Sequence, residues 1–402
     1  MTGMLQELDI ATQLVHAGER RPVPHGLPVS TPVYTSATFT YDSMAEMESV
    51  FSGETQGYVY TRFGNPTVAA LEEAVRVLEG GAGACAYSSG MAALHAAIFA
   101  CEPKPGAVVL ASQDLYGATT DLLYTVFGSF GIKTVTADFN DLEALEEKAR
   151  TEKARILIAE TISNPLLKVC DIDACARIAH EVGARLIVDN TFASPYLCRP
   201  LEHGADFVVH SATKYMSGHA DTMGGVVVTR DAADMMSLIG VMKLVGGVLG
   251  VWEAHTVLRG LKTLGIRLER QCANAAQLAE HFAGHPRLSR TYYPGLAASA
   301  SEQEKLGRVL RAANACALVS IELRDETREG VFRVMDGLRL CVRSTSLGDV
   351  FTGVLHPATA SHRELAPARR RQLGISEGLI RISVGIEAVA DIIADIERAL
   401  GT

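Results

Sequence analysis

Polar residues that could carry out chemistry follow two neighbouring apolar runs of the sequence. The run ARLIVDN ends near Asp189, and the run DFVVHSATKY supplies Ser211, Thr213 and Lys214. Taken singly, such a carboxylate is typical of an ion pair or a helix cap, and such a lysine of a solvated surface. Together they offer an amine, hydroxyl groups and a carboxylate, which an enzyme using pyridoxal 5′-phosphate (PLP) requires. We therefore predict a PLP site with the cofactor held by Lys214 as a Schiff base.

The elements that position these residues follow from the apolar pattern. Short apolar runs alternate with helical stretches, and the runs lack polar alternation, so they indicate strands buried on both faces of a largely parallel sheet. These runs span 106–112, 133–138, 154–160, 184–190, 206–211 and 224–229. The roughly 25 residues from Asp189 to Lys214 fit two neighbouring strands joined by a crossover. Both residues then lie beyond the carboxyl ends of strands, where open α/β sheets bind ligands.

Three regions divide the chain. Residues 1–62 contain several prolines and little periodicity, which predicts an extended arm laid over a partner subunit. Residues 63–256 form the expected large, PLP-binding domain, whose first helix begins at Asn65 and Pro66. Residues 257–402 continue a long helical pattern through His281 and then carry two apolar strands and a final helix, which is typical of a smaller α+β domain.

The composition argues against several kinds of partner. The net charge of −9 comes from interleaved acidic and basic residues, so neither nucleic acid nor a membrane surface is an expected partner. The eight cysteines include no C-x-x-C pair, and we interpret them as reduced core residues rather than metal ligands. The N-terminal residues lack the pattern of a secretory leader, so we expect a cytoplasmic protein with no metal.

Two other classes of protein share the alternating pattern. A nicotinamide dehydrogenase would need a G-x-G-x-x-G turn that opens a helix, but GGAGAC (80–85) precedes a short strand. A non-catalytic scaffold on the same fold would be expected to lack one of the four candidate residues Tyr116, Asp189, Lys214 and Arg381. All four are present.

Motifs spread over nearly the whole chain resemble the Cys/Met-metabolism family of PLP enzymes, which includes cystathionine γ-synthases and γ-lyases, methionine γ-lyases and homoserine sulfhydrylases. The motifs nearest Lys214 are HSATKY, VDNTFASPY and ETISNPLLKV. The others are YVYTRFGNPT (58–67), SSGMAA (88–93), DLYGAT (114–119), LRGLKTL (258–264), YYPGL (292–296), SLGD (346–349), HPAT (356–359) and GLIRISVGIE (378–387).

The resemblance implies a fold and an assembly. The fold is the PLP-dependent transferase fold type I (aspartate aminotransferase-like), with a mostly parallel seven-stranded sheet in the large domain and a smaller α+β C-terminal domain. The assembly is a homotetramer built as a dimer of dimers, in which Tyr60 and Arg62 reach the PLP phosphate of the neighbouring subunit. An arginine suits this role because its guanidinium can hold a phosphate through two hydrogen bonds.

The resemblance also assigns residues to the cofactor. Gly90 and Met91 begin a helix whose backbone N–H groups would hold the phosphate dianion, although a helix start packed on the sheet explains them equally well alone. Tyr116 would stack on the pyridine ring and assist proton transfer. The expected cofactor-binding set is Tyr60, Arg62, Gly90, Met91, Tyr116, Asp189, Ser211, Thr213 and Lys214, with Lys214 and Tyr116 as catalytic residues.

A second set would bind the substrate. By resemblance, Asn164 and Arg381 hold the α-carboxylate, and Ser346 lies nearby. Thr345 and Ala118 are expected to border the substrate's side chain.

Several of these positions depart from the family pattern. Thr345 stands where cystathionine-handling members usually carry Glu, and Ala118 stands where methionine γ-lyases typically carry Cys. Asp349 makes the segment SLGD, as in methionine γ-lyases and some sulfhydrylases, and Ile162 and Ser163 replace the commoner residues of ETPTNP. We predict γ-elimination on methionine, homocysteine or cystathionine. The alternative is γ-replacement on O-acetyl- or O-succinylhomoserine, as in a cystathionine γ-synthase or homoserine sulfhydrylase.

Overall fold

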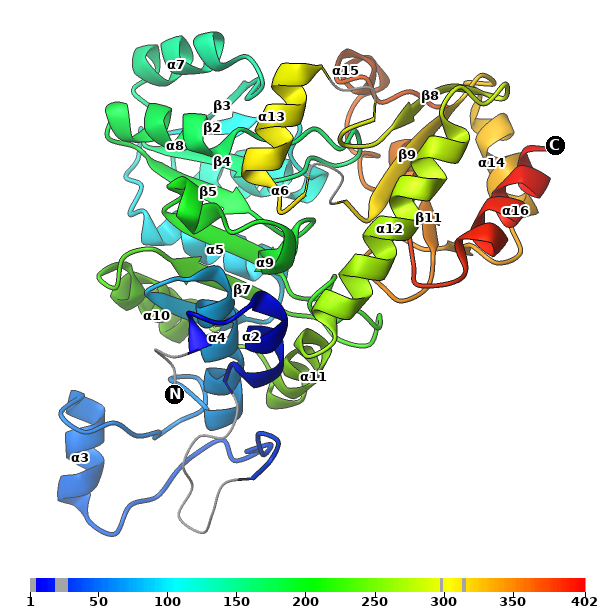
Figure 1. The fold of residues 1–402 in the computed structure, drawn as a ribbon. Helices are drawn as coiled ribbons and strands as arrows, with labels where there is room; N and C mark the ends of the chain where they lie inside the picture. Colours follow the sequence, from blue (N-terminus) through cyan, green and yellow to red (C-terminus); the bar gives the residue numbers. More distant parts are fainter. Residues whose placement is uncertain (1–4, 19–27, 297–298, 313–315, 402) are drawn as a thin grey trace.

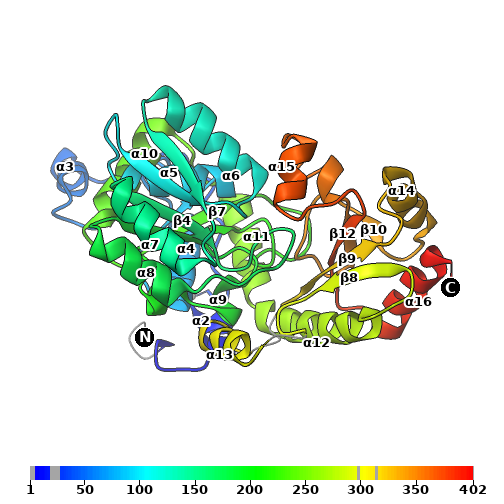
Figure 2. The same cartoon turned by 90° about the horizontal axis from the view of Figure 1, so that it is seen from above.

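Two β-sheets form the framework of the protein. The structure, a computed structural model, describes residues 5–18, 28–296, 299–312 and 316–401. A seven-stranded sheet occupies one side of the molecule in Figure 1, and a five-stranded sheet occupies the other. Figure 2 shows the same separation from above.

The larger sheet has the strand order β1-β7-β6-β5-β4-β2-β3. Only β7 runs antiparallel to its neighbours, so the predicted mostly parallel seven-stranded sheet is confirmed. Its strands are β1 (Gly83–Tyr87), β2 (Val108–Ser112), β3 (Lys133–Ala137), β4 (Ile156–Glu160), β5 (Arg185–Asp189), β6 (Phe207–Ser211) and β7 (Gly225–Thr229).

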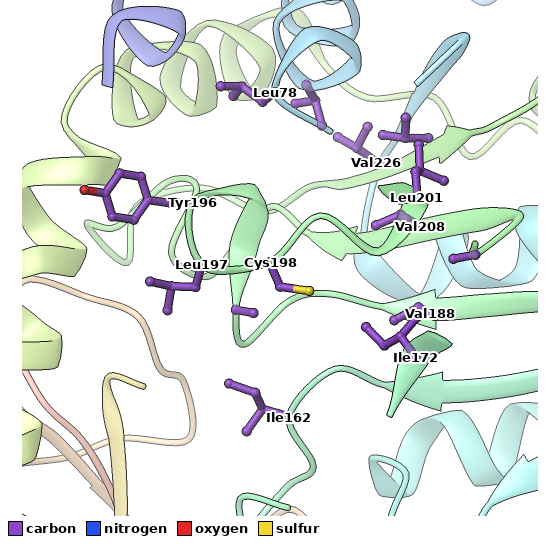
Figure 3. Close-up of a cluster of buried hydrophobic side chains, with 14 of the residues drawn as sticks. Leu78, Ile162, Ile172, Val188, Tyr196, Leu197, Cys198, Leu201, Val208 and Val226 are labelled. Atoms are coloured by element: carbon purple, nitrogen blue, oxygen red, sulfur yellow. The ribbon is translucent and has the colours of Figure 1, made fainter. Parts of the chain in front are cut away.

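Helices cover both faces of this sheet because alternate residues of each strand bury opposite faces. Val188, Val208 and Val226 belong to one core with α4 and α8, as Figure 3 shows, whereas Ile187 and Val209 belong to the core under α5 and α10. The helices of the larger unit are α4 (Pro66–Glu79), α5 (Gly90–Ala100), α6 (Gly117–Asp121), η1 (Leu122–Phe127), α7 (Leu142–Thr151), α8 (Ile172–Glu181), α9 (Ser194–Leu197), η2 (Pro200–His203) and α10 (Asp234–Val245).

The predicted start of α4 is observed. The Asn65 side chain accepts a hydrogen bond from the Thr67 N–H at 2.9 Å, and Pro66 occupies the first turn. Gly80 ends the helix in the left-handed conformation, with φ of 72°.

The smaller sheet has the order β10-β11-β12-β9-β8 and packs against α12, α14 and α16. The long helical pattern expected to continue through His281 is instead two helices, α11 and α12, separated at Lys262 and Thr263, and the Thr263 hydroxyl donates to the Gly260 carbonyl. From Val251 onward the chain forms α11 (Val251–Leu261), α12 (Leu264–Phe282), β8 (Leu288–Tyr292), α13 (Ala300–Val309), β9 (Leu318–Leu323), α14 (Arg328–Gly337), β10 (Val342–Arg343), β11 (Gly353–Leu355), η3 (Pro357–Thr359), α15 (Pro367–Gln372), β12 (Leu379–Ser383) and α16 (Val389–Leu400).

The N-terminal arm is not wholly extended. It contains α2 (Ile10–His16), which packs on α4, and α3 (Met44–Ser52), which has no buried residue and stands away from both sheets in Figure 1. Two of the arm's prolines, Pro22 and Pro24, lie outside the described residues. Among the helices that the structure describes, none is long and apolar enough to span a membrane.

Two helical glycines give a test of the packing around Lys214. A Cβ on Gly260 in α11 would lie 2.3 Å from the Ser217 carbonyl oxygen and 2.5 Å from that of Met216, whereas one on Gly240 in α10 would meet nothing within 4 Å. Alanine raises helix propensity by about 1 kcal/mol at either position. We expect Gly240→Ala to raise the thermal unfolding midpoint and Gly260→Ala to lower it. A rise for both variants would show that α11 does not pack tightly on the loop after Lys214.

Candidate active site

A cavity of about 390 Å³ lies at the carboxyl ends of β4, β5 and β6. Asp189, Ser211 and Lys214 line it from the large sheet, and Arg381 lines it from β12 of the small sheet. The crossover that was predicted between Asp189 and Lys214 is present, because β5 and β6 are parallel neighbours. Residues from both sheets therefore meet at the edge where open α/β sheets bind ligands.

Lys214 lies in the turn after β6. Its Nζ donates a hydrogen bond to the Ser346 hydroxyl at 3.1 Å. Burial and the nearby Arg381 guanidinium lower the pKa of the Lys214 amine. Gly348 has φ of 85°, and a Cβ there would lie 2.6 Å from the Tyr215 nitrogen, so the loop of Ser346 fits against Lys214 only with glycine at this position.

Two carboxylates stand side by side in the cavity wall. Glu160 ends β4 and Asp189 ends β5, and the two residues are directly paired in the sheet register. Burial raises the pKa of both groups, and for Glu160 the charge of Asp189 raises it further. Asp189 accepts a hydrogen bond from the Thr191 N–H at 2.9 Å, which favours its ionised form.

The N-terminus of α5 opens into the same cavity. Ser89 caps the helix by accepting from the Ala92 N–H at 3.1 Å, and Gly90 and Met91 line the cavity. A Cβ on Gly90 would lie 2.8 Å from Ser211 Cβ, so the helix start touches the end of β6. This contact brings the start of the helix beside the Ser211 hydroxyl, and Thr213 lines the same cavity, so the arrangement suits an anion.

Arg381 is a buried cation, with 2% of its surface exposed. Its Nη1 donates to Asn164 Oδ1 at 2.9 Å and its Nη2 donates to the Ser346 carbonyl at 3.3 Å. Burial lowers its pKa to about 10. Among the described residues it forms no salt bridge, and its Nε has no hydrogen-bond partner. A buried guanidinium without a counter-ion is a strong attractant for a carboxylate.

Of the remaining predicted residues, some line the cavity and others do not. Tyr116 and Thr345 line the cavity, and Tyr116 is 42% exposed. Ala118 lies in α6, half-buried, and is not among the described residues that line the cavity. Tyr60 and Arg62 also lie outside that lining. The Arg62 guanidinium lies 5.4 Å from the centre of the Tyr60 ring and donates to the Lys243 carbonyl.

The Cys/Met metabolism PLP-dependent enzyme family model matches residues 11–401 of this chain. The chain belongs to this family. It is 41% identical to an L-methionine gamma-lyase of Pseudomonas putida, over 97% of this chain and 96% of the relative. It is 39% identical to a cystathionine beta-lyase of Coxiella burnetii, over 97% of each chain. A crystal structure of a cystathionine gamma synthase from Xanthomonas oryzae matches with a TM-score of 0.91 and 36% identity, over 98% of each chain.

Membership confirms three of the sequence predictions. The chain is a PLP-dependent enzyme of fold type I, and its family includes both lyases and synthases that act on small amino acids. The cavity fits this cofactor, because it brings together an amine of lowered pKa and a helix N-terminus that suits a phosphate. It also contains the carboxylate of Asp189, which would pair with a protonated ring nitrogen of the cofactor.

Several cavity residues were not assigned from the sequence. Glu160 opens the motif ETISNPLLKV and is the last residue of the apolar run 154–160, so the rule that selected Asp189 would also have selected it. Its Oε1 accepts from the Tyr116 N–H at 2.6 Å and its Oε2 accepts from the Asn164 N–H at 3.2 Å. Thr191 and Phe192 lie in VDNTFASPY, and no local signal distinguished them from packing residues.

We expect Glu160→Gln to impair the enzyme without unfolding it. An amide nitrogen cannot accept a hydrogen bond, so the N–H of either Tyr116 or Asn164 loses its acceptor, at a cost of about 1 kcal/mol or more. This corresponds to a roughly fivefold or greater fall in kcat/KM. Glu152→Gln, at a surface pair with Lys133, is the control. Steady-state kinetics that gave equal values for the two variants would contradict the positioning role of Glu160.

Proposed function

We propose that this enzyme catalyses γ-elimination on a sulfur amino acid such as methionine, homocysteine or cystathionine. The observation that carries the proposal is the shared cavity of Lys214, Arg381 and Asn164. An amine of lowered pKa lies there beside a buried cation that lacks a carboxylate. An α-amino acid supplies that carboxylate and a proton on the adjacent carbon.

The cofactor would be held by residues of several elements. Lys214 would bond it covalently, and the N–H groups of Gly90 and Met91 would hold its phosphate together with the hydroxyls of Ser211 and Thr213. Asp189 would keep a proton on its ring nitrogen, and Tyr116 would stack on its ring. When bound, PLP supplies an electron sink for the bonds broken at the α- and β-carbons of the substrate.

The chain's own groups would then move the protons. Arg381 and Asn164 would hold the substrate carboxylate. Lys214 Nζ would take a proton from the α-carbon, pass that proton on to the bound cofactor and, as a neutral amine again, take a second proton from the β-carbon. The lowered pKa of Lys214 keeps more of this amine neutral, and so basic, than in free lysine. Tyr116 Oη gives a proton to the sulfur as the Cγ–S bond breaks. Methionine and one water would thus yield methanethiol, 2-oxobutanoate and ammonia.

The cavity walls support a thioether substrate. The side chains beside Lys214 include Ile162, Phe192, Met223 and Leu347, and their exposed atoms are mainly apolar. Thr345 adds a hydroxyl and no charge. Relatives named L-methionine gamma-lyase, at 37–41% identity, support the same interpretation.

A second candidate function is γ-replacement on O-acetyl- or O-succinylhomoserine. It is favoured by a relative named cystathionine gamma-synthase, 39% identical over 391 residues, and by the likeness to solved structures of such synthases. The two functions share the loss of the γ-substituent and differ in the next step, which is hydrolysis in one and capture of a thiol in the other.

The substrate panel that separates them uses the PLP-loaded protein. Methionine, cystathionine and O-succinylhomoserine are offered separately, with and without a thiol, and 2-oxobutanoate is measured. We expect 2-oxobutanoate from a thioether substrate without added thiol, and Lys214→Ala is expected to lose activity by at least about 100-fold. Lys133→Ala, at a surface lysine, is the control. A thioether product formed only with thiol, and no 2-oxobutanoate from any substrate, would replace the lyase by the synthase.

We also propose a homotetramer in which Tyr60 and Arg62 complete the site of a neighbouring subunit. Both residues lie outside the cavity of their own chain. Large apolar side chains are exposed on the same chain: Phe51 of α3 at 60%, Leu244 at 89%, which follows the Arg62 partner Lys243, and Trp252 of α11 at 63%. A second copy would bury these side chains.

Mixed oligomers test this shared site. Arg62→Ala should weaken PLP binding by about tenfold, because it removes a charge-assisted contact to phosphate. When Arg62→Ala subunits are co-expressed with Lys214→Ala subunits, each hybrid dimer within the tetramer contains one site with both defects and one intact site, so activity should return. If mixing restored no activity although hybrids formed, Arg62 would serve only its own subunit.

A further inference from the structure

An outer groove adjoins the catalytic cavity on the side of the small sheet. Its volume is about 300 Å³, and Thr345 and Ala360 line both the groove and the cavity. The groove therefore begins where the cavity ends. It runs past β11 toward α14, and none of its other lining residues has a role in the proposed mechanism.

The floor of the groove is apolar and carries no charge. Phe332, Val354 and Leu355 contribute hydrocarbon surface, and the His356 ring stands edge-on to Phe332 with 5.8 Å between ring centres. His356 hydrogen bonds through both nitrogens, to the Thr359 hydroxyl at 3.0 Å and the Glu377 carbonyl at 2.9 Å. Burial lowers the pKa of His356, so its ring is neutral at physiological pH. Such a floor suits methylene groups.

The rim of the groove carries one cation and one anion. Arg343 Nη1 donates to the Met335 carbonyl at 2.8 Å, which holds the guanidinium beside the next residue, Asp336. Both side chains line the groove, and among the residues that the structure describes neither forms a salt bridge. The guanidinium retains free N–H groups for a carboxylate, and the Asp336 carboxylate can accept from an ammonium.

We propose that this groove binds the leaving thiol of a two-ended substrate, in which the thiol carries its own ammonium and carboxylate, as in cystathionine. The proposal rests on the γ-elimination proposed above. The α-amino acid end lies against Arg381 and Asn164, the sulfur lies near Thr345, and the distal end reaches Arg343 and Asp336. The methyl group of methionine is too short to reach the rim. Thr345 need not be charged, because the charges lie farther out along the groove.

The test compares two substrates across matched variants of the PLP-loaded enzyme. We expect Arg343→Gln and Asp336→Asn each to lower kcat/KM for cystathionine by about three- to tenfold, mainly through KM, and to leave methionine within about twofold. Arg343→Lys should restore part of the loss. Arg333→Gln is the control, because this exposed arginine of the same helix does not line the groove. S-butylhomocysteine, which has methylenes but no distal charge, should respond to neither rim substitution.

The possible results distinguish failure of the groove proposal from failure of the proposed γ-elimination. Equal effects of the rim variants on methionine and cystathionine, no effect on either, or turnover of methionine but not cystathionine would overturn the groove proposal and leave γ-elimination standing. Absence of 2-oxobutanoate from both substrates in the unsubstituted enzyme would overturn the proposed function, and the groove proposal with it. The expected result is cysteine release from cystathionine whose kcat/KM falls selectively in the Arg343 and Asp336 variants.

Discussion

The burial of the Arg381 guanidinium constrains the whole site. This cation comes from the small sheet, and its hydrogen bonds reach Asn164 in the loop after β4 and the carbonyl of Ser346. The Ser346 hydroxyl in turn accepts from Lys214 Nζ. Burying an arginine without a counter-ion is costly, and these neutral acceptors satisfy only part of its hydrogen-bonding capacity. The unmet hydrogen-bonding capacity of Arg381 attracts a substrate carboxylate into the cavity. The substrate's α-carbon then lies beside the Lys214 amine that would take its proton.

The paired carboxylates at the ends of β4 and β5 have different surroundings, and these act differently on the pKa of each. The Thr191 N–H and the charge of His210 lower the pKa of Asp189 against the effect of its burial, whereas the charge of Asp189 adds to burial in raising the pKa of Glu160. Glu160 also links Tyr116 to Asn164 through their backbone N–H groups. One residue therefore connects the loop that would cover the cofactor with the loop that faces the substrate.

Much of the architecture was determined by local sequence. The uninterrupted apolar runs required strands buried on both faces, and polar residues directly after them had to lie at one edge of a parallel sheet, so Asp189 and Lys214 could be placed together without coordinates. The motifs around them identified the family. Glu160 obeyed the same rule and could have been found.

The contacts between distant segments were decided only by the tertiary structure. The break between α11 and α12 at Lys262 and Thr263 and the close packing of Gly260 on the Ser217 carbonyl are not recorded by periodicity. Ala118 shares a motif with Tyr116 yet lies outside the cavity lining. Arg343 and Asp336 are unremarkable surface charges in the sequence. They line the outer groove beside the cavity only because α14, β10 and β11 come together around that groove, and contacts between separate elements leave no periodic trace in a chain.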